Sequence, residues 1–75
     1  MTITVETGRW AARYVDSRII SLKMPDGLTV ADAIRATRIP EDEAGIAIVG
    51  GKAVPREQRL SDGDVLKIHP VIVGG

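Results

Sequence analysis

The last residues of the chain have the most clearly defined chemistry. The sequence ends in an apolar run followed by two glycines, Gly74 and Gly75. A terminal α-carboxyl has a pKa of about 3.5, so at neutral pH it is an unreactive carboxylate. It must be activated, for instance as an acyl-adenylate, before a sulfur or nitrogen nucleophile can attack it. Because glycine lacks a Cβ, this backbone can pass closely beside the walls and phosphates of an activating site.

The residues before the glycines form a candidate partner-binding segment. Three β-branched side chains in this run would be partly exposed in an isolated domain, and exposed apolar surface commonly marks a partner site. Such a run can dock in a groove or add a strand to a partner's sheet. A frayed terminus is the alternative interpretation. We predict that Gly75 is the reacting residue and that the partner-binding segment consists of Pro70, Val71, Ile72, Val73 and Gly74.

Other catalytic constellations are scarce. The chain has no cysteine, which excludes a disulfide scaffold, a thiolate zinc site, an iron–sulfur cluster and a cysteine nucleophile. The single histidine, His69, has no second histidine or cysteine to share a metal with, so an edge position beside the last strand explains it better. Gly50-Gly51 lacks the Lys-Ser/Thr of a phosphate loop and predicts a hairpin turn. We therefore expect no metal and no cofactor to be bound by this chain.

Composition narrows the class of protein. Seventy-five residues at 8.0 kDa allow one compact domain, and 44% apolar with 27% charged residues is typical of a globular chain. Ten Lys and Arg balance ten Asp and Glu, which argues against nucleic-acid binding and a polybasic membrane surface. No signal peptide or membrane-spanning run is visible, so we expect a cytoplasmic protein. Interleaved Arg9, Trp10, Arg13, Tyr14 and Arg18 leave RNA contact open, although a small core without Phe favours burying both aromatics.

Hydrophobic periodicity predicts one helix and five strands. Thr29 is a good N-cap with Asp32 in the capping-box position, and the amphipathic helix that follows is predicted to end near Ile39-Pro40. A short helical turn is expected over 9–15 and one turn of 3₁₀-helix over 55–60. Alternation predicts strands over 1–7, 18–24, 45–49, 52–54 and 65–69. The predicted core consists of Ile3, Val5, Ile20, Leu22, Val30, Ala33, Ile34, Ile46, Ile48, Leu60, Leu66 and Ile68.

Three segments of the chain, taken together, resemble segments of a known family. The run Leu60-Ser-Asp-Gly-Asp-Val-Leu-Lys-Ile68, followed by Pro70 and the terminal Gly-Gly, resembles the MoaD/ThiS family of ubiquitin-like sulfur carriers. Residues 24–34 are similar to that family's turn into its helix, and residues 45–56 to its later hairpin. The resemblance implies an α+β fold of the β-grasp (ubiquitin-like) type, a mixed sheet of four to five strands around one main helix. It also implies a domain over residues 1–70 and a C-terminal tail over 71–75.

The resemblance implies a carrier rather than an enzyme. Gly75 would be adenylated by an E1-like enzyme that uses ATP and Mg²⁺, then converted to a thiocarboxylate with sulfur from a persulfide donor protein. A synthase subunit would accept that sulfur for molybdopterin or its tungsten counterpart, or alternatively for the thiazole of thiamine. The long segment between the first two strands favours the molybdopterin type. Two other hypotheses stay open: a ubiquitin-like modifier conjugated through Gly75, and a β-grasp interaction module that is never activated.

Overall fold

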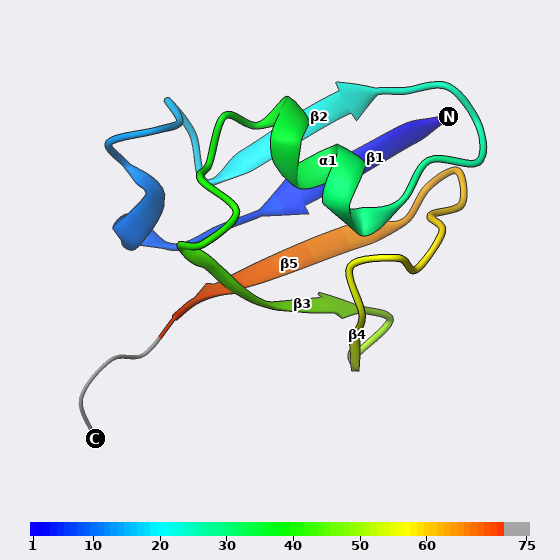
Figure 1. The fold of residues 1–75 in the computed structure, drawn as a ribbon. Helices are drawn as coiled ribbons and strands as arrows, with labels where there is room; N and C mark the ends of the chain where they lie inside the picture. The colour runs from blue at the N-terminus through cyan, green and yellow to red at the C-terminus, as the bar shows by residue number, and fades with distance from the viewer. Residues whose placement is uncertain (72–75) are drawn as a thin grey trace.

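One helix lies across one face of a five-stranded mixed sheet in the computed structural model, which describes residues 1–71 (Figure 1). The strands are β1 (Thr2–Glu6), β2 (Ile19–Lys23), β3 (Ala44–Val49), β4 (Lys52–Val54) and β5 (Val65–Pro70). The helical elements are the 3₁₀ segment η1 (Arg9–Ala11) and the helix α1 (Val30–Ala36).

The strand order β2-β1-β5-β3-β4 brings the two ends of the chain into one sheet. β1 and β5 are parallel neighbours, while β1–β2, β3–β4 and β3–β5 are antiparallel. The segment containing α1 connects the first two strands to the last three and covers the sheet on one side (Figure 1). The predicted α+β fold, with a mixed sheet around one main helix, is confirmed.

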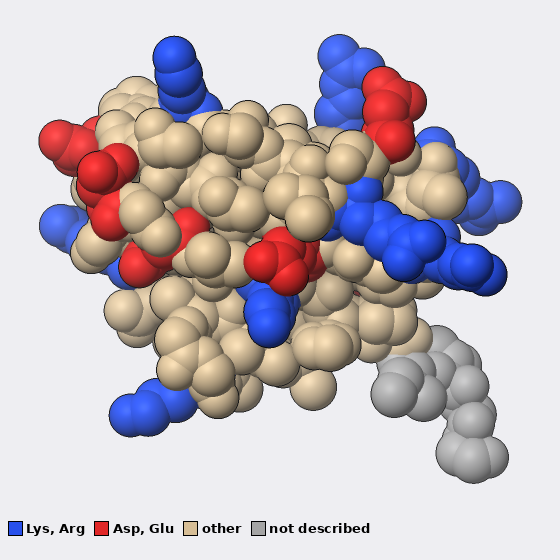
Figure 2. Space-filling view, turned by 180° about the vertical axis from the view of Figure 1, so that it is seen from behind, with Lys and Arg blue, Asp and Glu red and all other residues tan. Residues whose placement is uncertain are grey.

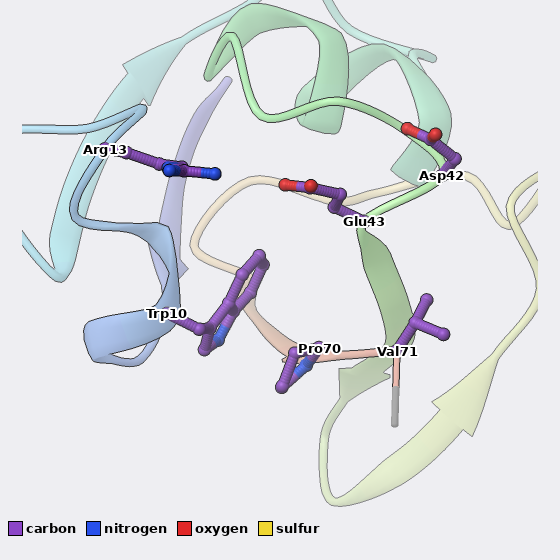
Figure 3. A pocket seen from close by; sticks show the side chains of 6 residues that line it. All are labelled: Trp10, Arg13, Asp42, Glu43, Pro70 and Val71. Atoms are coloured by element: carbon purple, nitrogen blue, oxygen red, sulfur yellow. The ribbon is translucent and has the colours of Figure 1, made fainter. Parts of the chain in front are cut away.

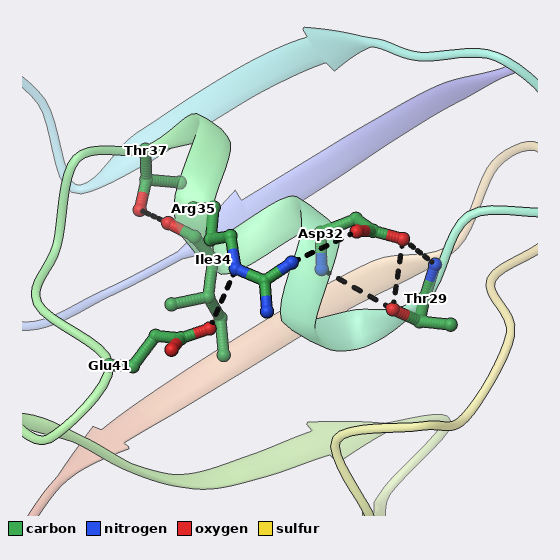
Figure 4. Close-up of polar contacts among 6 residues, drawn as sticks. All are labelled: Thr29, Asp32, Ile34, Arg35, Thr37 and Glu41. Atoms are coloured by element: carbon green, nitrogen blue, oxygen red, sulfur yellow. Dashed lines mark hydrogen bonds and ion pairs between the residues drawn. The ribbon is translucent and has the colours of Figure 1, made fainter.

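The helix begins as predicted and ends earlier than predicted. Thr29 and Asp32 form a complete capping box: Asp32 Oδ2 accepts from Thr29 N at 2.9 Å, and Thr29 Oγ1 accepts from Asp32 N at 3.3 Å (Figure 4). The helix stops at Ala36, before the expected end near Ile39-Pro40. Thr37 Oγ1 donates to the Ile34 carbonyl at 2.6 Å, and Arg38 takes a left-handed conformation with φ 71°, which terminates the helix.

The core lies between α1 and the sheet. Its largest fully buried side chains are Ile3, Val5, Val30, Ile34 and Leu66, all of them predicted core residues. Burying an aliphatic side chain of this size stabilises the fold by about 1.5–3 kcal/mol relative to leaving it exposed. The two aromatics are half-buried against this core, as expected, and Leu60 is buried. The predicted core positions on β1, α1 and β5 are therefore confirmed, whereas Ile20 and Leu22 of β2 pack against the core but are only half-buried.

The prediction for β3 is wrong. Ile46 is 57% exposed and Ile48 is only half-buried, while Ala47 is the buried residue between them. Ile48 pairs with Lys67, a residue of β5 whose side chain faces away from the core. Apolar residues occupy both faces of β3, so alternation alone does not determine its orientation. Pairing with β5 decides it, because Ala47 opposes the inward-facing Ile68.

The two tight turns are as predicted, and the segment between them differs. Gly50 and Gly51 have φ of 60° and 78°, the values of a two-residue hairpin turn. Residues 61–64 form a turn closed by Asp64 N donating to the Ser61 carbonyl at 3.0 Å. Residues 55–60 contain a single hydrogen-bonded turn rather than the expected 3₁₀-helix, because an isolated bridge to Thr29 extends the chain again at Arg59.

Candidate functional site: the exit of the C-terminal tail

The predicted partner-binding segment begins at the end of β5. Pro70 is the last residue of that strand and is half-buried, whereas Val71 follows it and is 48% exposed. The other predicted site residues, Ile72, Val73, Gly74 and Gly75, lie outside the described residues. The structure therefore shows how the protein holds the base of its tail.

Gly45 allows β3 to approach the end of β5 closely. A Cβ built on Gly45 would lie 2.8 Å from the carbonyl oxygens of His69 and Pro70, closer than real Cβ contacts. The register between the strands shifts at this point: Ala44 opposes Pro70, Ile46 opposes His69, and Gly45 is the extra residue of a bulge. Because these neighbours are backbone atoms, only glycine fits without moving the end of β5.

Hydrogen bonds fix the same junction from two directions. Val71 N donates to the Glu43 carbonyl at 3.3 Å, which ties the last described residue to the loop before β3. The guanidinium of Arg56 donates to the carbonyls of Ala44 and Gly45, the latter at 2.9 Å. The bulge leaves these carbonyls outside the regular ladder, and the arginine satisfies them. The direction in which the chain leaves the sheet is thus set by contacts on both sides.

A pocket of about 380 Å³ opens beside this exit (Figure 3). The Trp10 ring and Pro70 lie near each other and form its apolar wall, while Arg13 and Glu43 point toward one another across it (Figure 3). Asp42 and Val71 complete the lining. The segment after β1 therefore contributes an aromatic wall at the point where the tail begins.

Charges of both signs surround the pocket. The Glu43 carboxylate accepts a hydrogen bond from the Tyr14 hydroxyl and thereby raises the pKa of Tyr14 above its ordinary value. Arg13 lies over the Tyr14 ring, 6.0 Å from its centroid. Seen from the uncovered side of the sheet, adjoining basic side chains gather at the end where β5 terminates (Figure 2). Zero net charge thus coexists with local charge of one sign.

The remaining candidates do not assemble into a site. His69 is exposed on the uncovered face of the sheet, opposite Ile46. Within residues 1–71, no three His, Cys, Asp or Glu side chains are grouped to hold a metal ion. None of the helices in that range is long and apolar enough to cross a membrane.

Sequence analysis missed the residues that hold the tail's base. Trp10 was expected in the core, with RNA contact as the alternative, and Gly45, Glu43 and Arg56 were given no role. A lone glycine at the start of a predicted strand is a known signal for a bulge or a close backbone approach, and it applied to Gly45. Nothing in the sequence indicated that Arg56 would reach two carbonyls of another strand.

The fold and this exit define a ubiquitin-like protein of the β-grasp class. A family model described as Mut7-C ubiquitin matches residues 10–73. The chain belongs to this Mut7-C ubiquitin family. The resemblance to the ubiquitin-like MoaD/ThiS proteins is confirmed as well, by this match and by the solved structures below.

Solved structures from two archaea share the fold. The crystal structure of SAMP1 from Haloferax volcanii is similar over 100% of both chains, with a TM-score of 0.80 and 18% identity. A Pyrococcus furiosus protein assigned as molybdopterin converting factor subunit 1 matches with a TM-score of 0.77 and 17% identity, over 96% of this chain and 99% of its own. The H. volcanii HVO 2177 protein has a TM-score of 0.80 and 21% identity, covering 100% and 87%.

Proposed function

We propose that this protein is a sulfur carrier whose C-terminal Gly75 is adenylated and then converted to a thiocarboxylate. The observation that carries the proposal is a ubiquitin-like domain whose last strand leads directly into a tail ending in Gly-Gly. Membership of a ubiquitin family and likeness to a molybdopterin converting factor subunit support it. The protein is then a carrier and co-substrate, and the catalytic groups belong to its partners.

The chemistry has two stages. The Gly75 carboxylate attacks the α-phosphorus of ATP, held with Mg²⁺ by an E1-like partner, and displaces pyrophosphate to give an acyl-adenylate. The terminal sulfur of a persulfide donor then displaces AMP, and a second thiol cleaves the resulting acyl disulfide to leave the thiocarboxylate. The chain itself supplies the carboxylate and a defined direction of approach, since Gly45, Arg56 and Glu43 fix the point at which the tail leaves the sheet.

The uncovered face of the sheet is the surface we propose for docking the activating enzyme. Ile46 is 57% exposed there and pairs with His69, the residue before Pro70. An apolar contact at this position holds the domain close to the tail, so the enzyme can engage both at once. Lys67 lies on the same face beside Ile48 and adds a charge at the edge of the patch.

We propose that the sulfur acceptor is a synthase subunit of the molybdopterin or tungstopterin type. The second choice of acceptor is the synthase that makes the thiazole of thiamine. One named neighbour is a molybdopterin converting factor subunit, which supports the first choice. The long connection between β1 and β2, which carries Trp10 at the tail's base, supports it as well. The proposed location of this chemistry is the cytoplasm.

A second candidate function is protein modification. Another H. volcanii neighbour is described as small archaeal modifier protein 1, with a TM-score of 0.78 over 95% of this chain. The same acyl-adenylate would then react with a lysine amine, and Gly75 would end in an isopeptide bond. Both functions share the activation step and differ in the nucleophile.

Intact-mass spectrometry tests the proposal directly. The full chain is incubated with an E1-like enzyme of the same genome, ATP, Mg²⁺ and a persulfide donor. We expect a mass gain equal to the difference between sulfur and oxygen, located by fragmentation at Gly75. An unchanged mass, with the enzyme active on its own control substrate, contradicts the carrier function. Adducts to lysines of other proteins indicate the modifier function instead.

Two variants localise the chemistry. Deleting Gly75 should abolish the mass gain because the carboxylate then falls short of the adenylating site, and adding one alanine after it should do so because the carboxylate then lies beyond that site on a residue with a Cβ. Both should unfold at the same temperature as the parent chain, since the core ends at Ile68. If either variant still gains sulfur, the role given to Gly75 is wrong.

A further inference from the structure

Two loops of opposite charge flank the exit of the tail. The basic loop is the connection between β1 and β2, residues 7–18, and the acidic loop is the connection between α1 and β3, residues 37–43. Both loops contribute side chains to the pocket beside the exit. In the close-up of that pocket, Arg13 of the basic loop and Glu43 of the acidic loop reach over it from two sides (Figure 3). The base of the tail therefore lies between the two loops.

The basic loop carries three cations and one carboxylate. Arg9, Arg13 and Arg18 are exposed, and so is Asp16. Arg9 and Arg18 line one pocket of about 200 Å³, together with Asp16. In the described part of the chain, none of the three arginines forms an ion pair. The excess positive charge of this loop is thus available to a partner.

The acidic loop has the opposite composition. It holds three consecutive exposed carboxylates, Glu41, Asp42 and Glu43, and one cation, Arg38. Glu41 pairs with an arginine of α1 at 3.0 Å (Figure 4), whereas Asp42 forms no ion pair with any described residue. Arg38 lines a groove beside β2 and does not line the pocket at the exit. Asp42 and Glu43 are therefore the charges that this loop presents to the exit.

Three contacts hold the two loops at the base of the tail. The Glu43 carbonyl accepts from Val71 N at 3.3 Å, and the Glu43 carboxylate accepts from the Tyr14 hydroxyl. Arg13 lies over the Tyr14 ring, 6.0 Å from its centroid. Arg13 and Glu43 form no ion pair with each other within residues 1–71. The opposite charges are thus held on two sides of the exit without neutralising one another.

We propose that the enzyme that activates the tail encloses its base in a cleft with one acidic side and one basic side. The acidic side faces the basic loop, and the basic side faces Asp42 and Glu43. Docking in the reversed orientation would bring like charges together, so the two loops fix which way round the domain binds. Trp10 and Pro70 lie between the loops and supply the apolar centre of the contact. This surface acts only if Gly75 is activated, so the charges assigned to the enzyme rest on the proposed function.

Isothermal titration of the full chain with the E1-like enzyme of the same genome, without ATP, tests this arrangement. Arg13→Glu lowers the net charge of the chain by two units, and Asp42→Lys raises it by two. Each should weaken binding about fivefold, because each sets like charges against one side of the cleft. An enzyme that responds only to net charge would bind one variant more weakly and the other more tightly.

The double variant Arg13→Glu/Asp42→Lys separates the arrangement of charge from its total. Its net charge is zero, as in the parent chain, yet each loop has a reversed charge at the exit. We expect it to bind more than about tenfold more weakly than the parent. Arg9→Glu repeats the first reversal at a residue outside the pocket, so that the contact of Arg13 with the Tyr14 ring is kept.

Two reversals elsewhere on the surface are the matched controls. Lys52→Glu and Glu57→Lys change the net charge by the same amounts at exposed residues that do not line the pocket at the exit. Both should change binding by less than about twofold. Circular dichroism checks that all variants fold.

Trp10 locates the contact. It is the only tryptophan of the chain, so protein labelled with 5-fluorotryptophan has a single ¹⁹F resonance. We expect that resonance to shift when the enzyme is added, because the ring lies between the two charged loops. An unchanged resonance in a chain that binds the enzyme overturns the placement of the cleft at the exit.

The remaining outcomes distinguish this surface from the activation of Gly75. If the parent chain binds and gains sulfur while both single reversals bind as it does, the charged cleft is wrong and the carrier function stands. If one reversal weakens binding and the other strengthens it, charge of one sign surrounds the exit and the two-sided cleft is wrong. If the parent chain does not bind the enzyme at all, the proposed function fails, and the charged cleft fails with it.

Discussion

The two faces of the sheet differ in how deeply their apolar side chains are buried. The helix-covered face buries Ile3, Val5 and Leu66 completely against Ile34 of α1. The other face leaves Ile46 57% exposed and Val65 39% exposed, and charged side chains of both signs lie among its uncharged ones (Figure 2). Apolar residues on the first face stabilise the fold through burial, whereas Ile46 and Val65 on the second face remain in contact with solvent. Exposed apolar surface of this kind commonly marks a partner site, which is why the docking surface is proposed on the uncovered face.

The junction between β3 and β5 belongs to both faces. Gly45 shifts the register so that Ala44 and Ala47 both point into the core while Ile46 points outward. The same bulge brings two carbonyls to Arg56 and holds Val71 against Glu43. A single glycine therefore links the core to the exit of the tail.

The largest effect on the covered face should come from Ile34→Ala. Ile34 is fully buried, so truncation should lower the free energy of unfolding by about 2–5 kcal/mol. A core of this size rarely supplies more than about 3–5 kcal/mol, so much of the variant should be unfolded at room temperature. Urea denaturation followed by circular dichroism measures the loss. A change below about 1 kcal/mol would show that α1 contributes little to stability.

Gly45→Ala should have the next largest effect and should act on the junction itself. The new Cβ would collide with backbone atoms of His69 and Pro70, which costs about 1–3 kcal/mol and displaces the end of β5. Gly51→Ala is the control, because its φ of 78° is strained for alanine but its Cβ would have no neighbour within 4 Å. Both should be destabilised in urea, while only Gly45→Ala should shift the Val71 amide resonance. Equal shifts in both variants would contradict the close-approach argument.

Acid should weaken the helix cap by a smaller amount. Hydrogen bonds from Thr29, first from its backbone N–H, hold the pKa of Asp32 below its ordinary value. The folded state thus prefers the carboxylate, so this contribution is present above the unfolded-state pKa and is lost as the pH falls through the folded-state pKa. Asp32→Asn should be less stable than the parent at neutral pH, and the difference should shrink in acid. A difference independent of pH would contradict this assignment.

Ile46→Ser should have the smallest effect on stability and a clear effect on activation. Because Ile46 is exposed, the free energy of unfolding should change by less than about 0.5 kcal/mol. The KM of the adenylating enzyme for this chain should rise about fivefold, the loss expected when a contact worth about 1 kcal/mol is removed from an interface. Steady-state kinetics measure it, with exposed Val65→Ser as a matched control farther from the tail. If both substitutions raise KM equally, Ile46 has no special role.

Much of the fold was predictable from local signals. The capping box at Thr29, the Gly50-Gly51 turn and the alternation on β1 and β5 each depend on a few neighbouring residues, and each was predicted correctly. Two of the failed predictions concern segments whose local signals were ambiguous. Ile46 and Ile48 were placed inside because β3 is apolar on both faces, and the helix was extended to Ile39 because Arg38 gave no sign of a left-handed backbone.

The sequence by itself determined the order of the elements, because that order follows from residue types at short spacing. The lack of cysteine, the capped helix among alternating strands and the Gly74-Gly75 pair on which the proposed chemistry depends are readable without any long-range contact. Only the tertiary structure decided which face of β3 is buried and what holds the tail's base. Those outcomes depend on Gly45 meeting the backbone of Pro70 and on Arg56 reaching Ala44, contacts that exist only after distant segments pair.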